Sequence, residues 1–333
     1  MHLPKPEQLP GSHSGGQVAQ FALADYFAEQ VYPDWVRQRI RQGADVAAPG
    51  QTENATVLFT GWGAPQLNAE ELRRYPALQA VFHGAGSVRE LVSEALWDRG
   101  IRVSTAAGIN ADRVATFTLA QVILALKGYW RYGVPVTGGV QSAGLDTLGV
   151  DRGVVGLVGL GRIARRLAAL LQPLGVEILA YDPIAHREGR VPEGVHLVGL
   201  PELFSRSRVV SVHLPLLPST RGMLDGALLD LMQPYSTLIN TARGGVIDTP
   251  DLVAFLTRRP DITALLDVTE PEPLPLDHPL RQLSNVRFSP HIAGCIGSEV
   301  AAMGAFAADE FLRFCAGQPW LDEVTPASAA LSA

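Results

Sequence analysis

Several polar side chains stand directly after short apolar runs that we interpret as strands. Those able to take part in chemistry are Arg243, Asp267, Glu272 and His291. In open parallel sheets the carboxyl ends of the strands share one edge, and ligands bind outside that edge. We therefore expect these four side chains to gather at a single site.

These residue types fit hydride transfer to or from a carbonyl carbon that carries a carboxylate. Arg243 can hold the carboxylate in a forked, charge-assisted geometry that Lys cannot reproduce. His291 can give a proton to the carbonyl oxygen, or take one from the hydroxyl in the reverse direction. A carboxylate on the other imidazole nitrogen would fix the tautomer of the ring, and Glu270 and Glu272 both stand in a suitable segment. The hydride itself would come from a cofactor.

Residues 153–182 carry the pattern of a dinucleotide-binding βαβ unit. A buried apolar strand ends at Gly159-Leu160-Gly161, a helix with small Ala164 follows, and a second strand ends at Asp182. Gly159 permits the tight turn, Gly161 lets the backbone approach a pyrophosphate, and Ala164 lets helix and strand pack closely. Asp182 would accept hydrogen bonds from the ribose hydroxyls and repel a 2′-phosphate, which favours NAD over NADP. The alternative is an ordinary βαβ turn without a ligand.

Alternating strands and helices run through the whole chain and predict an α/β protein with two parallel-sheet units. A long apolar helix, capped by Asn110, is expected from Ala111 to about Trp130, and residues 131–152 are interpreted as a linker and arm. A last helix is expected over 294–314, followed by a tail that packs loosely on the surface. The predicted strands are 57–60, 78–83, 102–106, 154–158, 176–181, 195–198, 208–212, 237–240, 263–266 and 286–289.

The composition is that of a globular protein with a substantial core. The 333 residues are 47% hydrophobic and 18% charged, with a net charge of −6 that argues against a nucleic-acid surface. No apolar run is long enough for a membrane span, and residues 1–16 read as a flexible lead-in rather than a signal peptide. Cys295 and Cys315 cannot form a disulfide framework, and no ligand spacing suggests a metal. We expect a cytoplasmic protein without metal, nucleic-acid or membrane partners.

The motifs together resemble the D-isomer-specific 2-hydroxyacid dehydrogenase family. They are GLVGLGRIA (156–164), YDP (181–183), HLPLLPSTRGM (213–223), NTARGGVID (240–248), LDVTEPEPLP (266–275) and SPHIAG (289–294). The resemblance implies a Rossmann NAD-binding domain (111–292) inserted in a smaller flavodoxin-like substrate domain (1–110 and 293–333), usually as a homodimer. It also implies that the enzyme interconverts a D-2-hydroxy acid and its 2-keto acid.

The resemblance also assigns roles to individual residues. Arg243, Glu272 and His291 match the family's catalytic positions, with Glu272 selected over Glu270 by the register of the motif. The residues that the family pattern places at the substrate are Gly86, Ser87, Arg243 and Trp62. Those expected at NAD are Gly159, Gly161, Arg162, Ile163, Asp182, His213, Pro215, Thr220, Thr241, Ala242, Asp267 and His291.

Some positions depart from the family pattern and leave the identity of the acid open. Val88 and Arg89 follow Ser87 where an Asp is common, Thr116 replaces a frequent Glu, and Thr269 replaces an aromatic residue. Two other functions therefore stay open. One is an NAD-sensing corepressor on the same fold, and the other is a dehydrogenase of a non-carboxylate acid such as phosphite.

Overall fold

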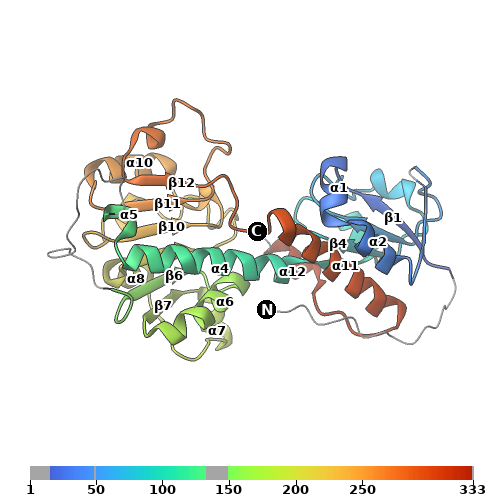
Figure 1. The fold of residues 1–333 in the computed structure, drawn as a ribbon, viewed down its shortest axis with the longest axis horizontal. Helices are drawn as coiled ribbons and strands as arrows, with labels where there is room; N and C mark the ends of the chain where they lie inside the picture. The colour runs from blue at the N-terminus through green and yellow to red at the C-terminus, as the bar shows by residue number, and fades with distance from the viewer. Residues whose placement is uncertain (1–15, 49, 133–148, 332–333) are drawn as a thin grey trace. The chain divides into compact units, whose positions relative to one another are not determined.

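The computed structural model describes residues 16–48, 50–132 and 149–331, which form two compact α/β units. The first unit combines the chain up to Ala107 with Gly297–Ala329, and the second consists mainly of Gly108–Ile296. Each unit has its own sheet and its own core (Figure 1). Residues 1–15 of the predicted lead-in (1–16) and residues 133–148 of the predicted arm (131–152) lie outside the described residues.

The first unit is built on a six-stranded sheet in the order β13-β5-β4-β3-β1-β2. All neighbouring strands are parallel except β13, which pairs antiparallel with β5. The strands are β1 (Val18–Ala22), β2 (Asp45–Val46), β3 (Val57–Thr60), β4 (Ala80–His83), β5 (Arg102–Thr105) and β13 (Glu323–Val324). The helices are α1 (Asp25–Val31), α2 (Asp34–Ile40), α3 (Glu94–Asp98), α11 (Val300–Cys315) and α12 (Pro326–Ala330), with short 3₁₀ turns η1 (Glu71–Arg74) and η5 (Gly297–Glu299).

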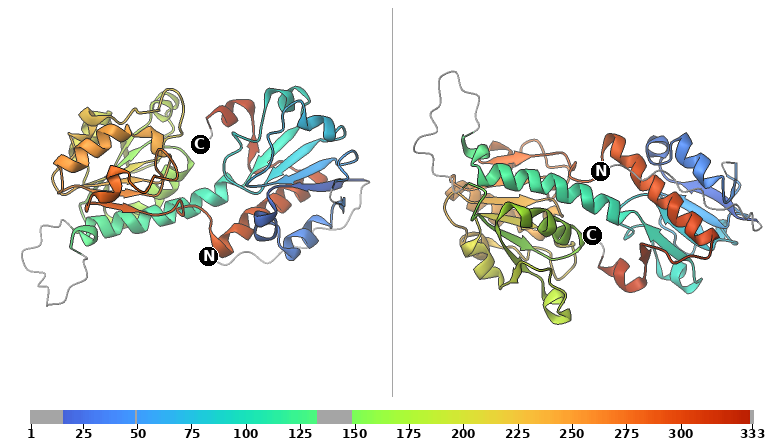
Figure 2. Two further views of the ribbon diagram at one scale, coloured as in Figure 1. Left: turned by 90° about the horizontal axis from the view of Figure 1, so that it is seen from above. Right: turned by 60° about the horizontal axis from the view of Figure 1, so that its bottom comes forward.

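Alternation along the strands gives this sheet two apolar faces. Phe59 and Phe82 stack on one face and meet Phe311 of α11 edge to face, at ring-centroid distances of 5.5 and 5.6 Å. Helix α11 runs beside α1 and α2 on this face (Figures 1 and 2). Leu58 and Val81 point to the other face and join a second apolar cluster.

The second unit is built on a seven-stranded parallel sheet in the order β12-β11-β10-β9-β6-β7-β8. The strands are β6 (Val154–Val158), β7 (Glu177–Tyr181), β8 (Val195–Leu197), β9 (Val209–Val212), β10 (Thr237–Asn240), β11 (Thr263–Leu266) and β12 (Val286–Phe288). The helices are α4 (Ala107–Leu126), α5 (Tyr129–Tyr132), α6 (Arg162–Leu171), α7 (Pro183–Glu188), α8 (Leu200–Arg206), α9 (Gly226–Leu229) and α10 (Thr249–Arg258), and the 3₁₀ turns are η2 (Gln172–Leu174), η3 (Gly244–Val246) and η4 (Pro279–Gln282).

Helices cover both faces of this second sheet. Helices α4 and α6 contribute to one buried cluster, and α8, α9 and α10 contribute to the other. Helix α4, which Figure 2 shows running along the sheet, is long and apolar enough to span a membrane, but Ala115, Val122 and Leu126 are buried in the core of this unit. The strand order reverses between β6 and β9, and the carboxyl ends of these strands are where such sheets bind ligands. The predicted fold class of two doubly wound sheets is confirmed.

The structure corrects three of the predicted elements. Helix α4 begins at Ala107, so Asn110 lies inside the first turn, and its Oδ1 accepts from the Cys295 amide at 2.9 Å instead of capping the helix. The last long helix begins at Val300 rather than at 294, and Gly294 lies in the preceding loop against the Asn110 side chain.

The tail after Ala316 is also not loosely packed. Strand β13 extends the first sheet, and Glu323 forms two hydrogen bonds with Arg102 at 2.7 and 2.8 Å. The Arg102 guanidinium also lies 3.9 Å from the centroid of the Trp320 ring. The short, polar sequence of β13 lacks the alternation of apolar residues that would reveal a strand.

Candidate active site

His291 and Glu272 meet at the carboxyl edge of the second sheet. Nδ1 of His291 lies 2.6 Å from Oε1 of Glu272, and the two side chains are 50% and 39% exposed. The Glu272 carboxylate accepts from Nδ1–H and fixes the tautomer, which leaves Nε2 available to a ligand. Glu270, the alternative partner, instead lies 3.7 Å from Arg221 Nη1.

His291 has an unusual backbone conformation that Asp267 supports. Its φ is +55°, in the left-handed region that side-chain-bearing residues rarely adopt. The His291 amide donates to the Asp267 carbonyl at 3.0 Å. The carboxylate of Asp267, which is 4% exposed, accepts from Ser289 Oγ at 2.6 Å and from the amides of Ile292 and Ala293 at 2.9 Å each. The single buried carboxylate of Asp267 thus holds the residues before and after His291 in place.

Arg243 lies in the turn after β10, and Asn240 shapes that turn. Asn240 Oδ1 accepts from the Ala242 amide, and Nδ2 donates to the Arg243 carbonyl, both at 3.0 Å. The next residue, Gly244, allows close contact with the segment that leads to Glu272, since an added Cβ would lie 2.0 Å from the carbonyl carbon of Thr269. The turns that carry Arg243 and Glu272 therefore pack directly on each other.

The sequence analysis did not identify Asn240 or the structural part played by Asp267, and it predicted Asn110 to be a helix cap. Asn240 had a visible signal, because an Asn that ends a strand and precedes a turn often bonds to its own backbone two residues on. The Asp267 contacts reach residues 22 to 26 positions away, and Asn110 reaches Cys295 across 185 positions. Contacts between residues so far apart in the chain leave no recognisable pattern in the neighbouring sequence.

The glycine turn after β6 has the form needed to bind a dinucleotide. Gly159 has a φ of +97°, and an added Cβ there would lie 2.9 Å from the His213 carbonyl oxygen. An added Cβ on Gly161 would meet no protein atom within 4 Å, so the protein itself does not require glycine there, whereas a closely approaching phosphate would. Among the described residues, the amides of Ile163 and Ala164 in the first turn of α6 have no acceptor and suit a pyrophosphate.

Asp182 stands at the end of β7, where a ribose-binding acid is expected, and has structural partners as well. Oδ2 accepts from the Leu160 amide at 2.8 Å, and Oδ1 caps α7 through the amides of Ile184 and Ala185 at 2.9 and 2.8 Å. The side chain remains partly exposed, and a carboxylate has further lone pairs for ribose hydroxyls. These bonds hold the acid beside the glycine turn.

His213 follows β9 next to that turn. Its Nε2 lies 2.9 Å from Ser211 Oγ, whereas Nδ1 is buried with no partner among the described residues. Burial lowers the pKa of His213 to about 4, which keeps the ring neutral at pH 7. This unpaired nitrogen lies beside the glycine turn and could form a hydrogen bond with a polar group of a bound dinucleotide.

The remaining predicted cofactor residues lie in the turns after these same strands. Thr220 Oγ1 closes the turn after β9 by donating to the Pro215 carbonyl, and Thr241 Oγ1 lies 3.3 Å from Thr118 Oγ1. Ala242 is buried, while Arg162 and Ile163 open α6. The predicted substrate residues Trp62, Gly86 and Ser87 belong to the first unit, in the loops after β3 and β4.

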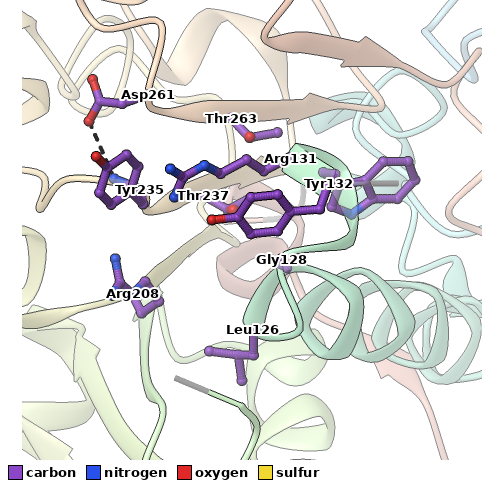
Figure 3. Close-up of a pocket in the computed structure, with 11 residues that line it drawn as sticks. Leu126, Gly128, Arg131, Tyr132, Arg208, Tyr235, Thr237, Asp261 and Thr263 are labelled. Atoms are coloured by element: carbon purple, nitrogen blue, oxygen red, sulfur yellow. Dashed lines mark hydrogen bonds between the residues drawn. The ribbon is translucent and has the colours of Figure 1, made fainter. Parts of the chain in front are cut away.

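A small cavity lies at the opposite, amino-terminal edge of the second sheet (Figure 3). Its lining includes Arg208, Thr237 and Thr263, which stand at the starts of β9, β10 and β11. The Arg131 guanidinium lies 3.7 Å from the Tyr235 ring centroid. This cavity contains none of the residues predicted at the substrate or at NAD.

This chain is similar to known proteins in sequence and in fold. Residues 121–293 match the model of the D-isomer specific 2-hydroxyacid dehydrogenase NAD binding domain. An (S)-sulfolactate dehydrogenase of Chromohalobacter salexigens is 35% identical over 73% of this chain and 82% of its own length. A glyoxylate reductase of Aeropyrum pernix is 30% identical over 76% of this chain and 78% of its own. The crystal structure of the TT0316 protein of Thermus thermophilus is 27% identical, with a TM-score of 0.72 over 93% of this chain and 100% of that one.

Proposed function

This chain belongs to the D-isomer-specific 2-hydroxyacid dehydrogenase family, and we propose that it interconverts a D-2-hydroxy acid and its 2-keto acid with NAD(H). The pairing of His291 with Glu272 at 2.6 Å, at the edge of the sheet that carries the glycine turn, is the observation that carries the proposal. A bound NADH supplies the hydride.

Each residue of the cluster has one task in this proposal. His291 Nε2 gives a proton to the carbonyl oxygen of the keto acid and recovers it in oxidation, while Glu272 holds the ring through Nδ1. Arg243 binds the carboxylate and orients the carbonyl carbon. Gly86, Ser87 and Trp62 of the first unit contribute further substrate contacts.

The proposed cofactor site follows from the turns at the switch point of the second sheet. Gly159, Gly161 and the first turn of α6 bind the pyrophosphate, and Asp182 binds the adenosine ribose. The preference for NAD over NADP rests on the negative charge of Asp182. Cytoplasmic location, a homodimer, and the lack of nucleic-acid, membrane or metal partners remain predictions.

A substrate panel tests the reaction class. NADH and NADPH oxidation would be followed with glyoxylate, pyruvate, hydroxypyruvate, phenylpyruvate and branched 2-keto acids, and NAD reduction would be followed with sulfolactate and phosphite. Sulfolactate and glyoxylate are included because of the names of the similar proteins. Saturable turnover of any 2-hydroxy or 2-keto acid supports the proposal. Turnover of phosphite alone, or NADH binding without any turnover, refutes it in favour of a non-carboxylate substrate or an NAD sensor.

A further inference from the structure

The loop formed by Gly84, Ala85, Gly86 and Ser87 after β4 has its carbonyl groups held by buried side chains. Thr105 Oγ1 donates to the Ala85 carbonyl at 3.0 Å and to the Gly86 carbonyl at 2.7 Å. The His83 ring forms a hydrogen bond with the Ser87 backbone that favours the protonated ring. A hydrogen bond that raises the pKa of a histidine has the ring N–H as donor, so here the Ser87 carbonyl is the acceptor. Thr105 thus holds the carbonyls of Ala85 and Gly86, and His83 contacts the backbone of Ser87.

Three amides of the same loop are not used by the protein, whereas the Gly84 amide donates to the Thr60 carbonyl at 2.8 Å. Among the residues that the structure describes, no acceptor pairs with the amides of Ala85, Gly86 or Ser87. Successive N–H groups without acceptors form a concave site for an anion. A carboxylate is the anion that the proposed substrate brings.

The side chains beneath the loop are themselves fully buried and paired. Tyr32 Oη donates to the Thr60 carbonyl at 2.8 Å and accepts from the Gly84 amide at 3.1 Å. His83 Nδ1 lies 2.8 Å from Thr60 Oγ1, and the His83 residue is 4% exposed. Burial lowers the pKa of His83 to about 4, so the ring is neutral at pH 7 and has a single N–H. With that N–H directed to Ser87, Nδ1 must accept from the Thr60 hydroxyl.

We propose that His83 and Thr105 are positioning residues that hold the Gly84–Ser87 loop so that the amides of Ala85, Gly86 and Ser87 are free to bind the substrate carboxylate. The inference rests on the proposed function, because it assigns the loop to the 2-keto acid. It adds that affinity for the acid is set by two side chains that do not touch it. The first sheet provides both residues at the ends of neighbouring strands, β4 and β5.

The test replaces each donor without a large change in volume. His83→Phe and Thr105→Val remove the bonds to the loop carbonyls, and each should raise KM for the best acid of the panel about tenfold or more. We expect kcat to change less than about threefold and NADH affinity to stay at the wild-type value, since the hydride-transfer residues are untouched. His83→Gln and Thr105→Ser keep a donor, and their KM should return to within about threefold of wild type. Oxamate titrated into the NADH complex provides the same comparison without turnover.

Val81→Ala is the matched control, because Val81 is fully buried on the same strand but belongs to the apolar cluster. It should lower Tm without raising KM. Unchanged KM and oxamate affinity in both His83→Phe and Thr105→Val, with an active wild type, overturn this inference and leave the proposed function standing. A KM rise as large in Val81→Ala overturns it too, because general loosening would then explain the effect. A wild type that neither turns over nor binds any acid refutes the proposed function, and the inference fails with it.

Discussion

Replacing Asp267 with Asn should disable the site through the backbone of His291. The carboxylate accepts from Ser289 Oγ and the Ile292 amide on one oxygen and from the Ala293 amide on the other. An Asn side chain accepts on one side only, so at least one buried donor loses its partner and faces an NH₂ group. Losing one such charge-assisted bond and leaving its donor unpaired costs about 2–4 kcal/mol.

The lost bonds also release the left-handed conformation of His291. A residue held in such a conformation stores about 1–3 kcal/mol, which its surroundings must offset. Once the turn relaxes, Nε2 moves away from the reacting oxygen, and a displacement of about 1 Å can reduce the rate by roughly 100-fold. We therefore expect Asp267→Asn to lower kcat by about 100-fold and the free energy of unfolding by about 2–4 kcal/mol.

Three measurements on the purified variant separate the possible causes. They are kcat for the best acid of the panel, the urea unfolding midpoint, and NADH affinity from fluorescence. Leu252→Ala is the control for stability alone, since this residue of α10 is 4% exposed and its truncation costs about 2–5 kcal/mol. It should leave kcat at the wild-type value. If Asp267→Asn weakens NADH binding but keeps kcat, the acid acts by binding NAD as the resemblance implies, and the positioning role of Asp267 is wrong.

Three further predictions concern the substrate, the cofactor and pH. Arg243→Ala should raise KM for keto acids and lower kcat, and an unchanged KM would remove its carboxylate role. Asp182→Ala should shift the ratio of NADH to NADPH activity toward NADPH, and an unchanged ratio would mean that another residue sets the preference. Because the acid also caps α7, the same variant should lose about 1–2 kcal/mol of stability. The pKa of His83 is about 4 in the folded protein and 6.5 in the unfolded chain, so the unfolded chain takes up a proton at higher pH. The free energy of unfolding should therefore fall by about 3 kcal/mol from this group as the pH drops from 6.5 to 4. A His83→Phe variant with the same pH dependence of unfolding as wild type would contradict this.

The strands of the second sheet, and β3, β4 and β5 of the first, could be predicted from the sequence because each is a short, mainly apolar run, whereas β1, β2 and β13 were not predicted. The central strands are buried on both faces, so nearly all of their residues must be apolar, and the run is visible in the sequence. These strands are 154–158, 209–212 and 237–240. Helix ends were less predictable. Asn110 looks like a cap by residue type, but a loop 185 positions away uses its side chain.

The residues of the site were predicted by type and motif, but their geometry was not. Glu270 and Glu272 are equivalent by spacing, and only the family register selects Glu272; the folded chain shows that Glu272 meets His291. The support that Asp267 gives to the His291 turn depends on a backbone angle, and the bonds that hold the Gly84–Ser87 loop depend on strand neighbours. Neither the backbone angle of His291 nor these loop hydrogen bonds can be recognised from the neighbouring sequence.

Turnover of wild type and His291→Gln, each measured with its NADH affinity, tests the central claim most directly. If His291 transfers the proton, the variant should lose about 10²- to 10⁴-fold in kcat on the best acid of the panel while binding NADH as tightly as wild type. Equal kcat in the two proteins would contradict the account, because the pair of His291 and Glu272 would then have no part in the reaction.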